Sequence, residues 1–258
     1  MMTNATLTRL LGCAAALAAL SLFSTSASAQ TAPAAPKPSP LRGSLSLGAG
    51  LANGAQAQRQ YGIDFDLERD LTKEGKLAAR FSRDYQRVTF PHDSLLNNRT
   101  AISGGAELHP GKNQLLMLQS MFLKDELLEV DSRFELLAGY GRRFAKADGT
   151  FRIEIVPGLS FYKEDLTFND DKGWKSGYGF FERMSARINK TWSVQNEFRI
   201  RKQFSTDNRS IESSATARAA MTKTISLELD YQYNHESTVP DGFPTYLSIL
   251  RVGLNVRF

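Results

Sequence analysis

An alternation of apolar and polar side chains at every second residue runs along most of the chain and constrains its fold more than any other feature. Its clearest stretch is 225–234, where Ile225 and Leu227 begin one face and Ser226 and Glu228 begin the other. Residues 61–68 and 151–162 repeat the pattern. A period of two places alternate side chains on opposite faces of a strand, whereas a helix repeats about every 3.6 residues. The sequence therefore predicts a β-sheet protein.

Segments with this period are long enough for strands that cross a membrane, and they predict an all-β antiparallel up-and-down barrel of about twelve strands. Two segments fit the period poorly. Residues 114–124 are apolar on both faces, and in 176–190 Glu182 falls on the apolar face, which predicts a bulge or a shifted register. The predicted strands span 43–52, 58–70, 76–88, 98–109, 114–124, 131–144, 150–163, 176–190, 191–203, 209–221, 224–234 and 245–258.

The predicted connections alternate between short and long. The short set is 71–75, 110–113, 145–149, 189–191 and 222–223, and the long set includes 89–97, 125–130, 164–175 and 235–244. Outer-membrane barrels have short periplasmic turns and longer external loops. With an even number of strands both termini fall on the short-turn side, so we expect periplasmic termini.

The charges on the polar face indicate which face points inward. A soluble barrel of this size would enclose a large apolar cavity, whereas an apolar wall facing lipid and a charged lumen satisfy both faces. Charges of mixed sign favour pairing within the lumen, because a buried Arg needs carboxylate partners. We expect a largely cross-linked lumen, with a narrow diffusion channel for small solutes as the alternative. The candidate lumen charges are Glu154, Arg183, Arg187, Glu197, Arg199, Arg201, Glu228 and Asp230.

The first residues have the features of a secretory signal. Arg9 is followed by the apolar run 10–23 and by Ala27-Ser28-Ala29, a small-residue cleavage site. Cys13 opens the apolar run, whereas a lipoprotein cysteine would close it. The predicted organisation is a cleaved signal peptide at 1–29, a Pro/Ala-rich periplasmic tether at 30–42 and an outer-membrane barrel at 43–258. The net charge of +5 comes from dispersed residues, so we expect no nucleic-acid partner.

The last predicted strand carries a candidate recognition signal. Arg251, Gly253, Val256 and Phe258 form the pattern polar, Gly, apolar and terminal aromatic. This pattern resembles the β-signal by which bacterial outer-membrane barrels are recognised. It implies two partners, the barrel assembly machinery through this strand and the outer-membrane lipid.

Two groups of residues suggest chemistry. His235 and Ser237 form a His-x-Ser pair, which in barrel lipases supplies a general base and a nucleophile. An acidic group at 164–165 and 169–171 could offer oxygen ligands to Ca²⁺, without the spacing of an EF-hand. Both groups fall in predicted loops, where such polar residues are common without a chemical role. We therefore assign no catalytic, cofactor or metal residues and expect a non-enzymatic protein, with a lipid hydrolase as a further alternative.

Three short motifs resemble one known family. They are 48–54 with 61–64, then 123–125 with 137–144, and 240–242 with the closing strand. The chain is similar to the YdiY-like salt-induced outer-membrane proteins, a family whose domain has no known function. The resemblance implies an outer-membrane barrel and a link to salt or osmotic stress, and it supplies no catalytic residues.

Overall fold

The computed structural model describes residues 41–53, 57–72, 74–89, 94–126, 130–166, 173–239 and 245–258. Within these ranges the chain forms β-strands and their connections. No described helix is long and apolar enough to cross a membrane. The strands are β1 (Arg42–Asn53), β2 (Ala57–Asp70), β3 (Gly75–Thr89), β4 (Ser94–Leu108), β5 (Gln114–Asp125), β6 (Val130–Ala145), β7 (Phe151–Leu166), β8 (Trp174–Arg187), β9 (Trp192–Gln203), β10 (Arg209–Ala220), β11 (Ile225–Glu236) and β12 (Tyr246–Arg257).

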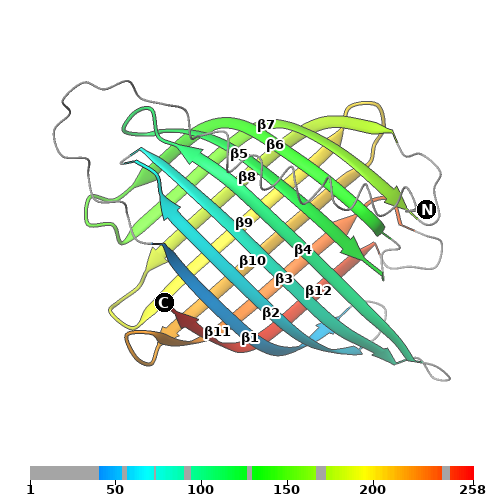
Figure 1. Cartoon of the computed structure of the whole chain (residues 1–258), viewed down its shortest axis with the longest axis horizontal. Coiled ribbons are helices and arrows are strands. Elements are labelled where there is room, and N and C mark those ends of the chain that lie inside the picture. Colours follow the sequence, from blue (N-terminus) through cyan, green and yellow to red (C-terminus); the bar gives the residue numbers. More distant parts are fainter. Residues whose placement is uncertain are drawn as a thin grey trace, which may run out of the picture. The chain divides into compact units, whose positions relative to one another are not determined.

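These twelve strands close into one antiparallel barrel (Figure 1). Each strand pairs with its neighbours in the chain, and β12 pairs with β1 from Ser44↔Arg257 to Asn53↔Ser248. Gly43 and Phe258 exchange two backbone hydrogen bonds, each of 3.0 Å. Both ends of the barrel chain therefore lie at one rim. The predicted all-β antiparallel up-and-down barrel of about twelve strands is confirmed.

We call the rim that holds these two ends the turn rim, and the opposite one the loop rim. The turn rim carries the connections 71–74, 109–113, 146–150, 188–191 and 221–224. In one of these turns Gly149 has a φ of 68°, which favours glycine. Beside it, the backbone N–H and the hydroxyl of Thr150 donate to the Asp148 carboxylate and hold its pKa below the usual value.

Several strands extend further toward the loop rim than the sequence predicts. β7 runs on to Leu166 and β11 to Glu236, whereas loops were expected from 164 and 235. Glu164 and Glu236 are buried inward side chains near these strand ends, and their polarity favoured a loop in the sequence. Of the loop-rim connections, 167–173 and 237–245 remain longer than any turn at the other rim.

The register of β8 differs from the prediction. Its pairing with β7 and β9 is continuous, so Glu182 causes neither a bulge nor a shift, and that prediction is wrong. Glu182 simply lies on the outer face, between Ile155 and Phe198. The hydrogen-bond ladder of the closed sheet outweighs the misfit of one side chain. Register shifts occur instead at Leu123/Asp125 in β5–β6 and at Val130/Ser132 in β6–β7.

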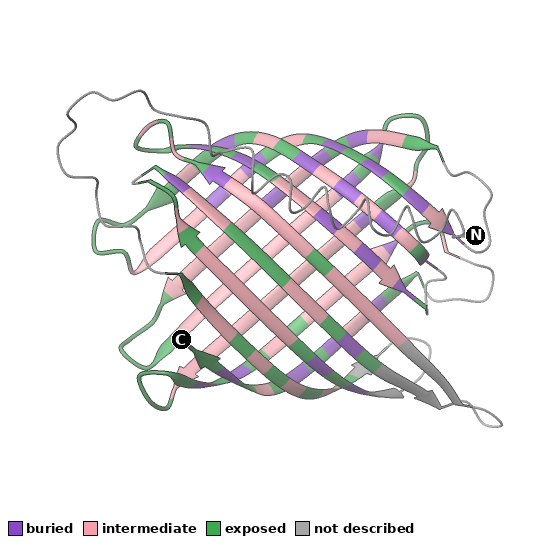
Figure 2. Ribbon diagram, viewed as in Figure 1, coloured by how far each residue is buried: buried purple, intermediate pink, exposed green. Residues whose placement is uncertain are grey.

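The outer face of the barrel is apolar and exposed. Leu159 is 46% exposed, whereas Val156, of opposite parity on the same strand, is 0% exposed. Bands of different exposure alternate along the strands (Figure 2). A wall of large exposed apolar side chains needs a lipid environment, and a closed barrel satisfies its backbone hydrogen bonds within it. The fold is thus a transmembrane β-barrel. The exposed wall includes Leu47, Leu51, Tyr61, Ile63, Leu118, Tyr140, Phe161, Tyr178, Leu229, Tyr231, Leu250 and Leu254.

Candidate functional site in the barrel lumen

Charged side chains that point inward meet in three clusters inside the barrel. The turn-side cluster contains Asp66, Arg80, Glu107, Glu154, Arg183 and Glu197. The loop-rim cluster contains Arg133, Glu135, Glu164, Arg201 and Glu236. The seam cluster contains Asp64, Asp84, Asp230 and Arg251 and lies where the first and last strands join.

The turn-side cluster links strands that are far apart in the ring. Arg183 of β8 pairs with Glu107 of β4 at 2.7 Å and with Glu154 of β7 at 3.2 Å. Its Nε pairs with Glu197 of β9 at 3.1 Å. Glu197 also lies 3.7 Å from Arg80 of β3, which holds Asp66 of β2. This chain of ion pairs crosses the lumen and limits the width of any open path.

The loop-rim cluster crosses the barrel at the other end. Arg133 of β6 donates to Glu236 of β11 at 2.6 Å and to Glu164 of β7 at 3.0 Å. Arg201 of β9 lies 3.8 Å from Glu236 and places its guanidinium 3.9 Å from the centre of the Tyr162 ring. All five of these side chains are at least nine-tenths buried. Buried charges of this kind must stay paired, because an unpaired one is costly.

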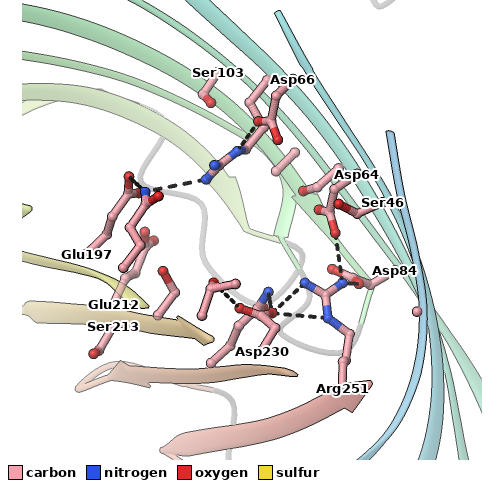
Figure 3. A pocket seen from close by; sticks show the side chains of 18 of the residues that line it. Ser46, Asp64, Asp66, Asp84, Ser103, Glu197, Glu212, Ser213, Asp230 and Arg251 are labelled. Carbon is pink, nitrogen blue, oxygen red and sulfur yellow. Dashed lines mark hydrogen bonds and ion pairs between the residues drawn. The ribbon is translucent and has the colours of Figure 1, made fainter. Parts of the chain in front are cut away.

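The seam cluster joins one arginine to three aspartates. Arg251 of β12 pairs with Asp64 of β2 at 3.2 Å and with Asp84 of β3 at 2.8 Å. It also pairs with Asp230 of β11 at 2.8 Å. Figure 3 shows the Arg251 side chain between Asp230 on one side and Asp64 and Asp84 on the other.

One side of the lumen is packed with apolar side chains. Leu115, Met117, Leu137, Val156 and Phe181 form a buried cluster on β5–β8, none more than 3% exposed. All five side chains point into the barrel. Val156 lies two residues from Glu154 on β7, and Phe181 lies two residues from Arg183 on β8. The two apolar faces of β5 are thereby explained, because one faces lipid and the other this packed core. On β6–β8 this apolar cluster lies next to charged residues of the two ionic clusters, namely Glu135, Glu154 and Arg183.

The remaining space lies beside the seam cluster and the strands β9–β11. A cavity of about 210 Å³ is bordered by the seam cluster, Arg80, Glu197 and polar residues of β9–β11. A second cavity of about 180 Å³ opens at the turn rim beside Thr150 and Arg187. The two cavities share Gln195, Thr216 and Arg218 in their walls. The two cavities therefore adjoin each other beside β9 and β10.

The structure places the predicted lumen charges as follows. Glu154, Arg183 and Glu197 belong to the turn-side cluster, and Arg201 to the loop-rim cluster. Arg199 contacts Gln119 across the lumen at 2.9 Å and Glu212 at 3.5 Å, Glu228 pairs with Arg218, and Asp230 holds Arg251. Arg187 is exposed beside the turn-rim cavity and forms no ion pair with any residue that the structure describes.

Sequence reasoning missed several members of these clusters. Arg80 and Asp84 lie in a segment with the correct period, and their parity opposite to Phe81 and Tyr85 could have identified them. Glu164 was grouped with an acidic loop, although it is a strand residue that pairs with Arg133 and with Lys175. Glu236 falls within the predicted connection 235–244, whereas the structure places it at the end of β11.

The His-x-Ser pair is not arranged as a base and a nucleophile. The Ser237 hydroxyl accepts a hydrogen bond from the Arg209 backbone N–H at 2.7 Å and donates to the Asn208 side chain at 3.2 Å. Its proton is therefore directed to Asn208. His235 lies on the outer face of β11, with the parity of Tyr231 and Tyr233. This geometry gives no support to the hydrolase alternative.

The acidic group near the loop rim is only partly described. Residues 169–171 lie outside the described ranges, while Glu164 is committed to Arg133 and Lys175. Across the described residues, no group of three or more His, Cys, Asp or Glu side chains could hold a metal ion.

The residues of the predicted assembly signal all lie in or next to β12. Arg251 points into the lumen and Val256 faces outward, 42% exposed. Gly253 pairs with Gly48 of β1. Phe258 is 66% exposed, and its ring stacks on Phe65 at 6.2 Å between centroids.

Comparison with known proteins gives a family and a fold. A family model described as "Protein of unknown function, DUF481" matches residues 45–258, which agrees with the resemblance to the YdiY-like proteins. No curated protein matches the sequence. The barrel is similar to the NanC porin, with a TM-score of 0.57 and 11% identity over 82% of this chain and 98% of that chain. It is also similar to the COG4313 outer membrane channel from Pseudomonas putida F1, with a TM-score of 0.53 and 11% identity over 90% of this chain and 100% of that chain.

Proposed function

Because this chain belongs to the DUF481 family of proteins of unknown function, we propose its function from the lumen itself. It is an integral outer-membrane barrel that carries out no chemistry and offers a narrow, polar path to water, small ions and small solutes. The observation that carries this proposal is the pair of adjoining cavities beside β9 and β10, which lie next to ion pairs that cross the lumen.

The outer-membrane location is supported by several independent features. The exposed wall is apolar, and the sequence begins with a predicted signal peptide at 1–29 and ends with the predicted assembly signal. Two structures of similar fold are described as a porin and as an outer membrane channel. With the turn rim in the periplasm, the loop rim faces the exterior.

The path is narrow because the lumen is occupied from both sides. The apolar core on β5–β8 fills part of the lumen, and the Arg80–Glu197 contact crosses the space that remains. At the loop rim, Arg133 and Glu236 join β6 to β11. Twelve strands lie between barrels filled by side chains and barrels with an open channel, so the side chains decide the width.

Single-channel recording tests this proposal. The protein, purified from membranes in detergent, is inserted into planar bilayers beside a wide porin recorded under the same conditions. We expect discrete current steps clearly smaller than those of the wide porin. Liposome swelling should likewise admit only the smallest sugars. Folded barrels that give no current above the bilayer background would end the proposal, and so would steps as large as those of the wide porin.

We also propose a link to salt or osmotic stress. Its support is the resemblance to salt-induced proteins. Protein abundance should increase after NaCl is added to growing cells. Sucrose at equal osmolarity distinguishes an ionic response from an osmotic one, and an unchanged abundance in both media would count against the link.

A further inference from the structure

The side chain of Arg251 crosses the place where the barrel closes. Arg251 lies on the last strand, and its backbone partner on the first strand is Gly50. Its guanidinium nevertheless reaches past β1 to Asp64 of β2 and Asp84 of β3, while the same group holds Asp230 of β11 (Figure 3). One buried cation, 7% exposed, therefore connects both ends of the sheet.

Glycines on β1 and β2 leave room for this crossing. Gly62 of β2 pairs with Gly48 of β1 on one side and with Asp84 on the other. A Cβ at Gly62 would lie 2.3 Å from Nη1 of Arg251 and 2.7 Å from the Asp84 carboxylate. A side chain at position 62 would therefore force the Arg251 guanidinium or the Asp84 carboxylate away from its present position.

The partners of Arg251 become available at different stages. Asp230 lies on β11, directly opposite Arg251 in the β11–β12 hairpin, so this pair can form within the hairpin alone. Asp64 and Asp84 lie near the other end of the chain, on strands that β12 approaches only by pairing with β1. Before that happens, Asp64 and Asp84 are neighbouring carboxylates without this cation, and like charges repel.

We infer that Arg251 acts as a clasp for barrel closure: its pair with Asp230 belongs to the last hairpin alone, and capture of the same guanidinium by Asp64 and Asp84 fastens β12 to the β1–β3 end of the sheet. Arg251 is thus a positioning residue for the seam as well as the polar residue of the predicted assembly signal. The inference goes beyond the proposed function and does not depend on whether the lumen conducts.

Cysteine pairs can report closure directly. Leu47 and Leu254 face each other across the seam, and Leu227 faces Leu254 within the last hairpin. The one cysteine of the sequence, Cys13, lies in the predicted signal peptide, so it should not interfere. Protein purified from membranes is unfolded in urea and refolded into detergent micelles. The rate of disulfide formation is followed for the variant Leu47→Cys/Leu254→Cys and, separately, for Leu227→Cys/Leu254→Cys.

Two aspartates give a matched comparison, because Asp84→Asn and Asp230→Asn make the same change to partners of the same guanidinium. We expect Asp84→Asn to slow formation of the seam disulfide about ten-fold, since a charge-assisted hydrogen bond is lost. Gly62→Ala should slow formation of the seam disulfide similarly, because the added methyl group would occupy space next to the Arg251–Asp84 pair. Asp230→Asn should change the seam rate by no more than about two-fold, and the hairpin disulfide should form at the same rate in Asp84→Asn and Gly62→Ala as in the unmodified background.

Two results would overturn the clasp. One is a seam rate unaffected by Asp84→Asn and Gly62→Ala. The other is an equal slowing of the seam and the hairpin disulfides, which would show a general folding defect. A variant that fails to refold is examined by gel mobility before and after heating, with the same two cysteine pairs read in barrels extracted from membranes.

Discussion

The guanidinium of Arg80 lies 3.7 Å from the carboxylate of Glu197, although β3 and β9 stand on opposite sides of the twelve-strand ring. Glu197 also accepts a hydrogen bond from Nε of Arg183 at 3.1 Å. One carboxylate thus connects three strands at the point where the lumen is already reduced by the apolar core. Replacement of Glu197 therefore tests the proposed path directly.

Glu197→Gln should raise the single-channel conductance by about two-fold, because Arg80 and Arg183 lose the carboxylate that holds them across the path. Two less compensated guanidinium groups should also shift the reversal potential in a KCl gradient toward anions. Glu182→Gln is the matched control, since it makes the same change on the outer face. Equal conductance and selectivity in both variants would mean that the path does not pass Glu197.

The sequence predicts those features of the structure that depend on nearby residues, and it does not predict contacts between residues on distant strands. The period of two is local, and it predicted the strands, the closed barrel and the inward position of Glu154 or Arg183. Which inward charges meet is not local, because Arg80 and Glu197 are brought together only by ring closure. Glu164 and Glu236 were expected in loops because polarity does not distinguish a loop from a strand end that faces a charged lumen. The apolar core was hidden as well, since Leu115 and Leu116 look alike until one face is known to point inward.

Arg133→Ala should lower the free energy of unfolding by about 3 kcal/mol, because it leaves Glu164 and Glu236 buried with weaker partners. Urea unfolding in micelles, followed by tryptophan fluorescence, measures the change. Lys202→Ala provides the comparison, because the Lys202–Asp207 pair is exposed and should contribute about 0–1 kcal/mol. Similar losses of stability in the two variants would mean that water reaches the loop-rim cluster and that its ion pairs contribute no more than an exposed pair.

Ser237→Ala should leave the release of fatty acids from lipid vesicles at the level of protein-free vesicles, as in the unmodified protein. The reason is geometric: the Ser237 hydroxyl is engaged by the Arg209 backbone and by Asn208. His235→Ala serves as the second variant. Lipid release by the unmodified protein that disappears in both variants would instead establish the hydrolase.

Phe258→Ala should lower the amount of barrel inserted in the outer membrane of cells several-fold while leaving refolding in micelles intact. The aromatic ring is mostly exposed, and its one described ring contact is with Phe65, so its loss should cost the folded barrel little. Recognition by the assembly machinery operates only in cells, which separates the two measurements. Equal loss in cells and in micelles would assign Phe258 a purely structural role.

Glu182→Leu should raise the free energy of unfolding in lipid vesicles by about 1 kcal/mol. The carboxylate faces outward between Ile155 and Phe198 in an otherwise apolar wall, and an acidic residue on the lipid face destabilises a barrel by an amount that depends on its depth. Leucine removes that cost and fills the same surface, while Glu182→Gln removes the charge and keeps the size, so it should give an intermediate value. Urea titrations in vesicles of two thicknesses measure the effect, which should be larger in the thicker bilayer because Glu182 is then further from water. A loss of stability with leucine would mean that Glu182 has a polar partner within the membrane, and the outer wall around β8 would then be a contact surface rather than a lipid-facing one.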